Sequence, residues 1–382
     1  MSLRNGTLAG RKVRVLVVDD QSTVRAILQQ GLSEDSDIEI VGWASNAYSA
    51  RDRIVQLSPD VVTLDVEMPR MSGLEFLKKL MPQYPLPVVM VSSFTGAGQA
   101  ATLEALEAGA VDFVCKPDGS AGQIHTMLDE LRNKVKIAAR VDREKLRKKF
   151  ALPVSAPNVT VARAPVREKP TTGTIDSITR VIAVGASTGG TTALRELLAG
   201  LTPDLPGMVV VQHMPAGFTA MFASNLNKTC PFEVREARSG DQVLPGQVLI
   251  APGDLHLTLQ KKDNAYYVSI SMDEKVSGHR PSVDVLFNSV ADEAGEEAIG
   301  ILLTGMGADG ARGLLRMRAN GSRTIGQDEE SSVVYGMPKV AYSLGAVEFQ
   351  KSLLDIPKAV IELVQNNKAR RKTENKYETT PR

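Results

Sequence analysis

The sequence is poor in cysteine and in net charge, and both shortages exclude classes of protein. Cys115 and Cys230 are the only cysteines among 382 residues, too few to staple a secreted chain of this size, so we expect a reducing compartment, the cytoplasm. The 45 basic and 44 acidic residues leave a formal net charge of +1. This balance argues against a nucleic-acid binder, because such domains usually carry a basic excess that neutralises phosphates.

Long apolar runs are also missing. The opening MSLRNGTLAG contains no apolar segment of the kind found in signal peptides. No later stretch approaches the roughly 20 apolar residues that span a bilayer. We therefore expect neither secretion nor insertion into a membrane.

Length and hydrophobic patterning predict two α/β domains. At about 150 residues per domain, a chain of this length holds two. Over residues 12–135, short β-branched runs alternate with amphipathic stretches, the pattern of a parallel sheet covered by helices. Five strands are expected there, at 13–18, 38–43, 61–64, 88–91 and 112–114. The helix-favouring stretch 128–150 would be the last helix of this domain, extended outward.

A change of composition separates the two domains. Residues 136–177 combine the end of that helix with a proline-rich stretch typical of an extended linker. A second α/β domain is expected over 178–365, followed by a polar tail over 366–382. Its strand-like runs recur at 181–184, 208–212, 248–251, 255–259, 266–271 and 299–303. Two of them flank a short turn, which predicts a hairpin beside a mostly parallel sheet.

Polar side chains follow several strands of the first domain. Asp19 and Asp20 follow the first strand and Asp65 follows the third, so the three carboxylates should meet at the carboxyl edge of the sheet. Their repulsion requires a cation, and an all-oxygen ligand set suits Mg²⁺. Ser92 and Lys116, after the fourth and fifth strands, would supply a hydroxyl and a positive charge for a phosphoryl group. A single aspartate at a strand end is usually only a cap, but five matching positions outweigh that alternative.

The segments VRVLVVDD, DVVTLDVEMPRMSG, PVVMVSS and GAVDFVCKP together resemble the receiver domain of two-component response regulators, across nearly all of residues 12–125. The resemblance implies a flavodoxin-like sheet and phosphorylation of Asp65 by a sensor histidine kinase. It also implies that Mg²⁺ binds to Asp19, Asp20 and Asp65, and that Ser92 and Lys116 contact the phosphoryl group. Phe113 matches the aromatic switch position of the family, although a core phenylalanine would look the same.

In the second domain, RVIAVGASTGG runs from a hydrophobic strand into a small-residue turn and then a helix. This pattern would present Ser187 at a helix N-terminus, a favourable place for a nucleophile whose product is an anion. An N-cap serine or a phosphate-binding loop would give a similar pattern. The dinucleotide fingerprint fails, however, because Ser187 replaces its second glycine.

A serine nucleophile needs a base, and the chain contains four histidines. His213 is the one that follows a buried-type strand, whereas His125 lies in the first domain, His256 in the hairpin and His279 in a loop. Asp309 lies in the glycine-rich turn after a third strand, where it could orient the histidine or simply cap a helix. The order Ser, His, Asp differs from that of α/β-hydrolases.

GASTGG, QHMPAGFT and LLTGMGADGARG together resemble the catalytic domain of the chemotaxis protein-glutamate methylesterase family, called CheB, over residues 178–365. The resemblance implies Ser187 as nucleophile, His213 as base and Asp309 as orienting acid, with no metal required. Thr188 and the backbone around Met306 and Gly307 are implied as support for the oxyanion.

The implied activity is hydrolysis of glutamate γ-methyl esters on methyl-accepting chemoreceptors, with glutamine deamidation as a second reaction, in chemotaxis adaptation. Phosphorylation of the receiver would activate it. Two alternatives stay open. The same hydrolase could serve another chemosensory array, or the chain could be a non-catalytic response regulator whose second domain only docks a partner.

Overall fold

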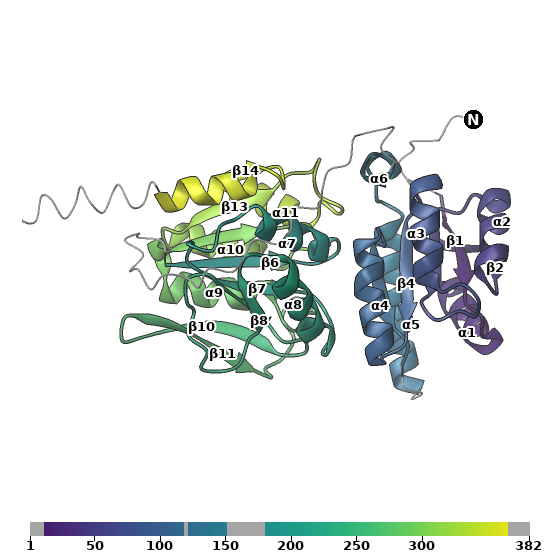
Figure 1. Ribbon diagram of the computed structural model, residues 1–382, viewed down its shortest axis with the longest axis horizontal. Helices are drawn as coiled ribbons and strands as arrows, with labels where there is room; N and C mark the ends of the chain where they lie inside the picture. Colours follow the sequence, from purple (N-terminus) through teal and green to yellow (C-terminus); the bar gives the residue numbers. More distant parts are fainter. Residues whose placement is uncertain (1–10, 118–120, 151–179, 366–382) are drawn as a thin grey trace, which may run out of the picture. The chain divides into compact units, whose positions relative to one another are not determined.

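The computed structural model of the protein describes residues 11–117, 121–150 and 180–365 (Figure 1). These residues form two compact units, one before and one after residue 160. Of the predicted linker region 136–177, the part after residue 150 lies outside the described residues, as does the predicted tail over 366–382.

The first unit contains a five-stranded parallel sheet, as predicted. Its strands are β1 (Val13–Val18), β2 (Ile38–Ala44), β3 (Val61–Asp65), β4 (Val88–Ser92) and β5 (Asp112–Cys115). Their order is β2-β1-β3-β4-β5, with every pair parallel, which is the flavodoxin-like arrangement. The strand order reverses between β1 and β3. A crevice for ligands is therefore expected beyond the carboxyl ends of these two strands.

Helices cover both faces of this sheet: α1 (Ser22–Ser33), α2 (Ala47–Leu57), α3 (Gly73–Gln83), α4 (Gly96–Glu107), α5 (Ala121–Ala138) and α6 (Arg143–Phe150). Helix α3 illustrates the local logic. The Ser72 hydroxyl accepts the Glu75 N–H and the Glu75 carboxylate accepts the Ser72 N–H, a capping box that starts the helix. Its apolar side chains then turn toward the sheet and are buried.

The single helix expected over 128–150 is instead two helices. The Asp142 carboxylate accepts the Glu144 N–H at 2.8 Å and so caps the start of α6, which separates it from α5. Helix α6 packs against α3, and Arg143 donates a hydrogen bond to the carbonyl of Pro59 at 2.6 Å. Residues 143–150 therefore belong to the first unit and do not extend outward.

The second unit is built on a seven-stranded sheet in the order β14-β13-β12-β6-β7-β9-β8. Its strands are β6 (Val181–Ala186), β7 (Gly207–Gln212), β8 (Glu233–Glu236), β9 (Gln247–Ile250), β12 (Ala298–Leu302), β13 (Arg323–Gln327) and β14 (Phe349–Lys351). All pairs are parallel. The predicted α/β class is confirmed, but the sequence analysis did not predict β8, β13 or β14.

The predicted hairpin is also present, formed by β10 (His256–Lys262) and β11 (Ala265–Ser271). Asp263 and Asn264 both adopt positive φ angles, 49° and 60°, as a two-residue hairpin turn requires. The hairpin packs on α9 (Val283–Glu293), and the apolar side chains of both join the core against β6, β7 and β9.

The remaining helices of this unit are α7 (Gly190–Ala199), α8 (Phe218–Thr229), α10 (Ala311–Ala319) and α11 (Met337–Ser343), with a 3₁₀ turn at Gly295–Glu297. Strands β12, β6 and β7 are neighbours, so the loops that leave their carboxyl ends share one edge of the sheet. In the described parts of both units, no helix combines the length and apolar character needed to cross a membrane.

Candidate functional site

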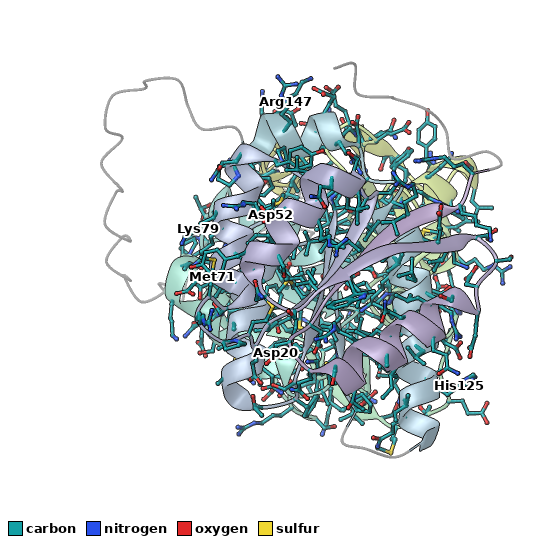
Figure 2. All side chains as sticks on the ribbon, turned by 90° about the vertical axis from the view of Figure 1, so that its right-hand side faces the viewer. Asp20, Asp52, Met71, Lys79, His125 and Arg147 are labelled. Atoms are coloured by element: carbon teal, nitrogen blue, oxygen red, sulfur yellow. The ribbon has the colours of Figure 1, made fainter. Side chains whose placement is uncertain are left out.

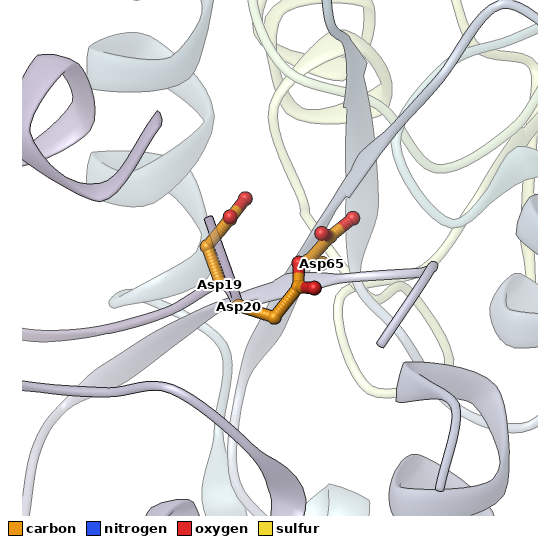
Figure 3. A group of neighbouring side chains, drawn as sticks. All are labelled: Asp19, Asp20 and Asp65. Carbon is orange, nitrogen blue, oxygen red and sulfur yellow. The ribbon is translucent and has the colours of Figure 1, made fainter. Parts of the chain in front are cut away.

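Three aspartates gather at the carboxyl edge of the first sheet (Figure 3). Asp19 and Asp20 follow β1, and Asp65 is the last residue of β3. One carboxylate oxygen from each lies within 4.8 Å of the others. Asp19 and Asp65 are buried, so their mutual repulsion is weakly screened by solvent.

Lys116 extends from the end of β5 into this cluster. Its Nζ lies 2.9 Å from Asp19 Oδ2 and 2.8 Å from Asp65 Oδ2. Burial raises the pKa of Asp65 to about 6, although the Lys116 ammonium opposes the rise. Oδ1 of Asp20 is buried and accepts no hydrogen bond from the described part of the chain. One ammonium thus pairs with two of the three carboxylates, and Oδ1 of Asp20 is left for a further cation.

Ser92 and Phe113 make contacts outside the cluster of the three aspartates and Lys116. Ser92, the last residue of β4, is buried; its hydroxyl lies 3.2 Å from the carbonyl of Gly98 and accepts a 2.7 Å hydrogen bond from Thr102. It is therefore engaged by α4, and no hydrogen bond between Ser92 and Asp65 occurs in the first unit as described. Phe113 is buried, with the Lys134 ammonium 5.1 Å from the centre of its ring.

In the second unit, the imidazole of His213 contacts both Ser187 and Asp309, as predicted. Nδ1 of His213 lies 3.1 Å from Oγ of Ser187, and Nε2 lies 2.8 Å from Oδ2 of Asp309. His213 and Asp309 are almost fully buried, with side-chain exposures of 8% and 1%. The three residues follow β6, β7 and β12, the neighbouring strands at the centre of the sheet.

The turn that carries Ser187 is held tightly by its neighbours. The Ser187 N–H donates to the carbonyl of Thr304 at 3.0 Å, so it is not free to bind a ligand. Gly189 has a φ of 77°, which favours glycine. A Cβ on Gly305 would lie 2.7 Å from the Cβ of Ser187, so only glycine allows the loop after β12 to approach this closely. The serine side chain is therefore presented on a rigid backbone.

Asp309 lies in the loop between β12 and α10, and its side chain contacts the N-terminus of α9. Its carboxylate accepts the N–H groups of Val283 at 2.7 Å and Asp284 at 3.1 Å, and the hydroxyl of Ser282 at 2.8 Å. Burial alone would raise the pKa of Asp309, but these bonds and the one to His213 lower it to about 2. The group is therefore an anion at neutral pH, placed to accept the Nε2 proton of His213 and to leave Nδ1 facing the serine with a lone pair.

Gln212 connects the two loops that carry Ser187 and His213. Its buried side-chain amide donates to the carbonyl of Ser187 at 2.9 Å and to the carbonyl of His213 at 3.1 Å. Sequence analysis missed Gln212 as well as Ser282. Ser282 carries an N-cap signal, because it precedes α9, but neither contact with the site can be read without the tertiary structure.

Of the three predicted supporting residues, Thr188 is buried and its carbonyl accepts the hydroxyl of Thr304 at 3.0 Å. Gly307 has a φ of 88°, and the space where its Cβ would lie is open. Within the described residues, the N–H groups of Met306 and Gly307 donate no hydrogen bond. Since Gly305 contacts Ser187, these two N–H groups belong to a loop that runs directly beside the serine.

Two of the remaining histidines take no part in the contact chain that joins Ser187, His213 and Asp309 in the described residues. His125 projects from the surface of α5 (Figure 2), with 72% of its side chain exposed. His256 is buried at the start of β10, where its ring is hydrogen-bonded to the backbone of Glu274 and Ser282.

Comparisons with known proteins match both units. The family model for CheB methylesterase matches residues 182–360, and the model for the response regulator receiver domain matches residues 15–129. A protein of Sulfurimonas denitrificans named protein-glutamate methylesterase/protein-glutamine glutaminase is 50% identical over 93% of this chain and 99% of its own length. A protein of the same name from Syntrophotalea carbinolica is 49% identical over 94% of this chain and 99% of its own.

Among solved structures, the catalytic domain of the Thermotoga maritima CheB methylesterase covers 49% of this chain and 99% of its own. Its sequence identity is 36% and its TM-score is 0.48.

Proposed function

Since the chain belongs to the CheB methylesterase family, we propose that it is a phosphorylation-activated hydrolase that removes the methyl group from glutamate γ-methyl esters of chemoreceptors. The contact chain from Ser187 through His213 to Asp309 is the observation that carries the catalytic part of this proposal. The receiver unit carries the regulatory part.

In the proposed reaction, the Ser187 hydroxyl attacks the ester carbonyl while Nδ1 of His213 takes its proton. The tetrahedral intermediate collapses as His213 returns that proton to the leaving methoxide, and methanol departs. Water, deprotonated by the same nitrogen, then hydrolyses the acyl-enzyme and regenerates the serine with a free glutamate carboxylate. Asp309 stays ionised throughout and stabilises the imidazolium.

The N–H groups of Met306 and Gly307 are the proposed donors to the oxyanion, because they lie beside Ser187 and form no other hydrogen bond within the described residues. Thr188 supports the same loop through Thr304. A glutamine side chain can follow the same route, with ammonia as the leaving group in place of methanol. Deamidation is therefore the proposed second reaction.

In the receiver unit, Asp65 is the proposed phosphoryl acceptor and a sensor histidine kinase the proposed donor. Asp19, Asp20 and Asp65 would hold a Mg²⁺ ion, which suits their all-oxygen donor set and the unpaired Oδ1 of Asp20. When bound, the ion would neutralise the charge that a phosphoryl group adds. Lys116 would contact the phosphoryl group directly.

Ser92 and Phe113 are the proposed switch residues. The Ser92 hydroxyl must leave Gly98 and Thr102 to reach a phosphoryl group on Asp65. Because Thr102 lies on α4, that movement would disturb the packing of this helix. It would also disturb Phe113, which lies on β5, the strand beside β4.

The test is release of methanol from membranes that contain methylated chemoreceptors, with and without a small phosphodonor and Mg²⁺. We expect slow release by the unmodified protein and faster release with the phosphodonor. Asp65→Asn should keep the slow rate and lose the stimulation. No methanol release from any receptor preparation, combined with hydrolysis of a small activated ester, would favour another chemosensory array as the source of substrate. The absence of both activities would favour a non-catalytic response regulator.

A further inference from the structure

The loop between β11 and α9 presents a second histidine to the proposed catalytic centre. Val276 and His279 exchange main-chain hydrogen bonds of 2.9 and 3.1 Å. Between them, Ser277 and Gly278 have φ angles of 54° and 80°, the signature of a type I′ turn. His279 thus follows a regular two-residue turn, which defines the direction of its side chain.

The imidazole of His279 stacks on that of His213. The ring centroids are 3.8 Å apart and the planes are inclined by only 10°, so the two faces are in van der Waals contact. Ser187 and Asp309 hold the edges of the His213 ring through its two nitrogens. The His279 ring covers one face of the His213 ring, which the hydrogen bonds at its two nitrogens leave uncovered.

Both ends of this loop are anchored to the body of the unit. His256 is buried; its Nε2 donates to the carbonyl of Glu274 at 2.9 Å and its Nδ1 accepts the N–H of Ser282 at 3.2 Å. Arg280 donates to the carbonyl of Asp273 at 2.9 Å, closing the loop on itself. The same Ser282 donates its hydroxyl to Asp309. The loop that positions His279 is therefore coupled to the acid of the site.

We propose that His279 is a positioning residue, which holds the imidazole of His213 in the plane where Nδ1 faces Ser187 and Nε2 faces Asp309. This inference rests on the proposed role of His213 as the base. The terminal torsion of a histidine side chain has broad minima, so two edge contacts allow the ring to tilt out of the plane they define. A parallel ring at 3.8 Å blocks that tilt on one side and keeps water from that face.

The stack also acts during the reaction. His213 becomes positively charged when it takes the serine proton, and the face of an aromatic ring attracts a cation placed against it. The interaction free energy of a stacked aromatic pair is large enough that its loss from the transition state would slow the reaction about 2- to 13-fold. Because the ring face, and not proton transfer, supplies the effect, phenylalanine can replace His279.

The test compares His279→Ala, His279→Leu and His279→Phe in the full-length protein, with Lys275→Ala as a control on the exposed part of the same loop. The measurements are kcat and KM for a small activated ester, the rate of inactivation by a fluorophosphonate, and Tm. We expect the Ala and Leu variants to lose about 2- to 13-fold in kcat and in inactivation rate at unchanged KM. The Phe variant and the control should remain within about twofold of wild type.

Wild-type kcat in the Ala and Leu variants would overturn the proposal. A Phe variant as slow as the Ala variant would overturn it as well, because the imidazole would then act through its own protons. Ser187→Ala distinguishes a failure of the proposed nucleophile from a failure of the role of His279. Activity that survives in Ser187→Ala overturns the proposed nucleophile and this inference together, whereas an inactive Ser187→Ala beside unimpaired His279 variants overturns the inference alone.

Discussion

Asp309→Asn perturbs the group that contacts both His213 and the N-terminus of α9. Burial opposes ionisation of Asp309, yet its hydrogen bonds lower the pKa from 3.8 to about 2. At about 1.4 kcal/mol per pKa unit, the carboxylate stabilises the fold by about 2 kcal/mol at neutral pH. Because the pKa is lowered by folding, this contribution is complete above about pH 4 and is lost as the pH falls toward 2.

The amide of asparagine cannot reproduce these contacts. Each oxygen of Asp309 accepts a hydrogen bond from a backbone N–H group, so the new NH₂ group faces an N–H group in a buried site, which costs about 1 to 3 kcal/mol. We expect a total loss of about 2 to 4 kcal/mol in the free energy of unfolding. An NH₂ group that donates to Nε2 also moves the His213 proton to Nδ1, where it blocks proton transfer from Ser187. The equivalent change in serine proteases lowers kcat about 10⁴-fold, and we expect a similar loss.

Calorimetry at neutral pH and kcat for a small activated ester measure the two effects. Asp292→Asn is the matched control, because Asp292 lies on α9, the helix whose N-terminus Asp309 contacts, is half exposed and pairs with Arg316 at the surface. It should change stability by less than about 0.5 kcal/mol and leave kcat unaltered. An Asp309→Asn variant that keeps kcat within tenfold of wild type, with an unchanged Tm, would refute the reasoning.

Gln212→Met should lower kcat about 10- to 100-fold, because it removes the hydrogen bonds from Gln212 to the carbonyls of Ser187 and His213. A kcat equal to wild type would show that these two hydrogen bonds are dispensable. Combining His213→Ala with Asp309→Asn should slow the reaction no more than His213→Ala alone; additive losses would argue against one catalytic unit. Asp65→Asn should raise the Tm of the receiver transition, because burial raises the pKa of Asp65 to about 6 and the ionised carboxylate therefore lowers the stability of the fold at neutral pH. This gain should be full above about pH 6 and vanish below about pH 4, and a pH-independent difference would contradict it.

Strands with long apolar runs were predictable because fully buried parallel strands are continuous hydrophobic segments. β6 reads VIAVGA and β7 reads GMVVVQ, with every residue buried. The topology rule for parallel sheets then predicts that Ser187, His213 and Asp309 lie at one edge, and in the structure their side chains are in contact.

The strands that escaped prediction lack this signal. β8 (EVRE) and β14 (FQK) are short edge strands with charged, partly exposed side chains. β13 reads RTIGQ, and its polar Thr324 and Gln327 are buried because partners from distant loops satisfy them. Such partners are fixed by tertiary structure, so local patterning cannot reveal them.

The same reason explains the residues missed around the site. Gln212 occupies a strand end where any polar residue could cap a turn, and its role follows from bonding to two loops at once. The sequence places His279 merely in a loop, and only the fold brings its ring onto His213.

Locating the covalent intermediate tests directly whether Ser187 is the nucleophile. The protein is mixed with p-nitrophenyl acetate, quenched in acid within the first turnover, digested and mapped by mass spectrometry. We expect an acetyl group on the peptide that contains Ser187, absent from Ser187→Ala and strongly reduced in His213→Ala. Turnover with no acyl group on Ser187, or with an acyl group on another residue, would contradict it.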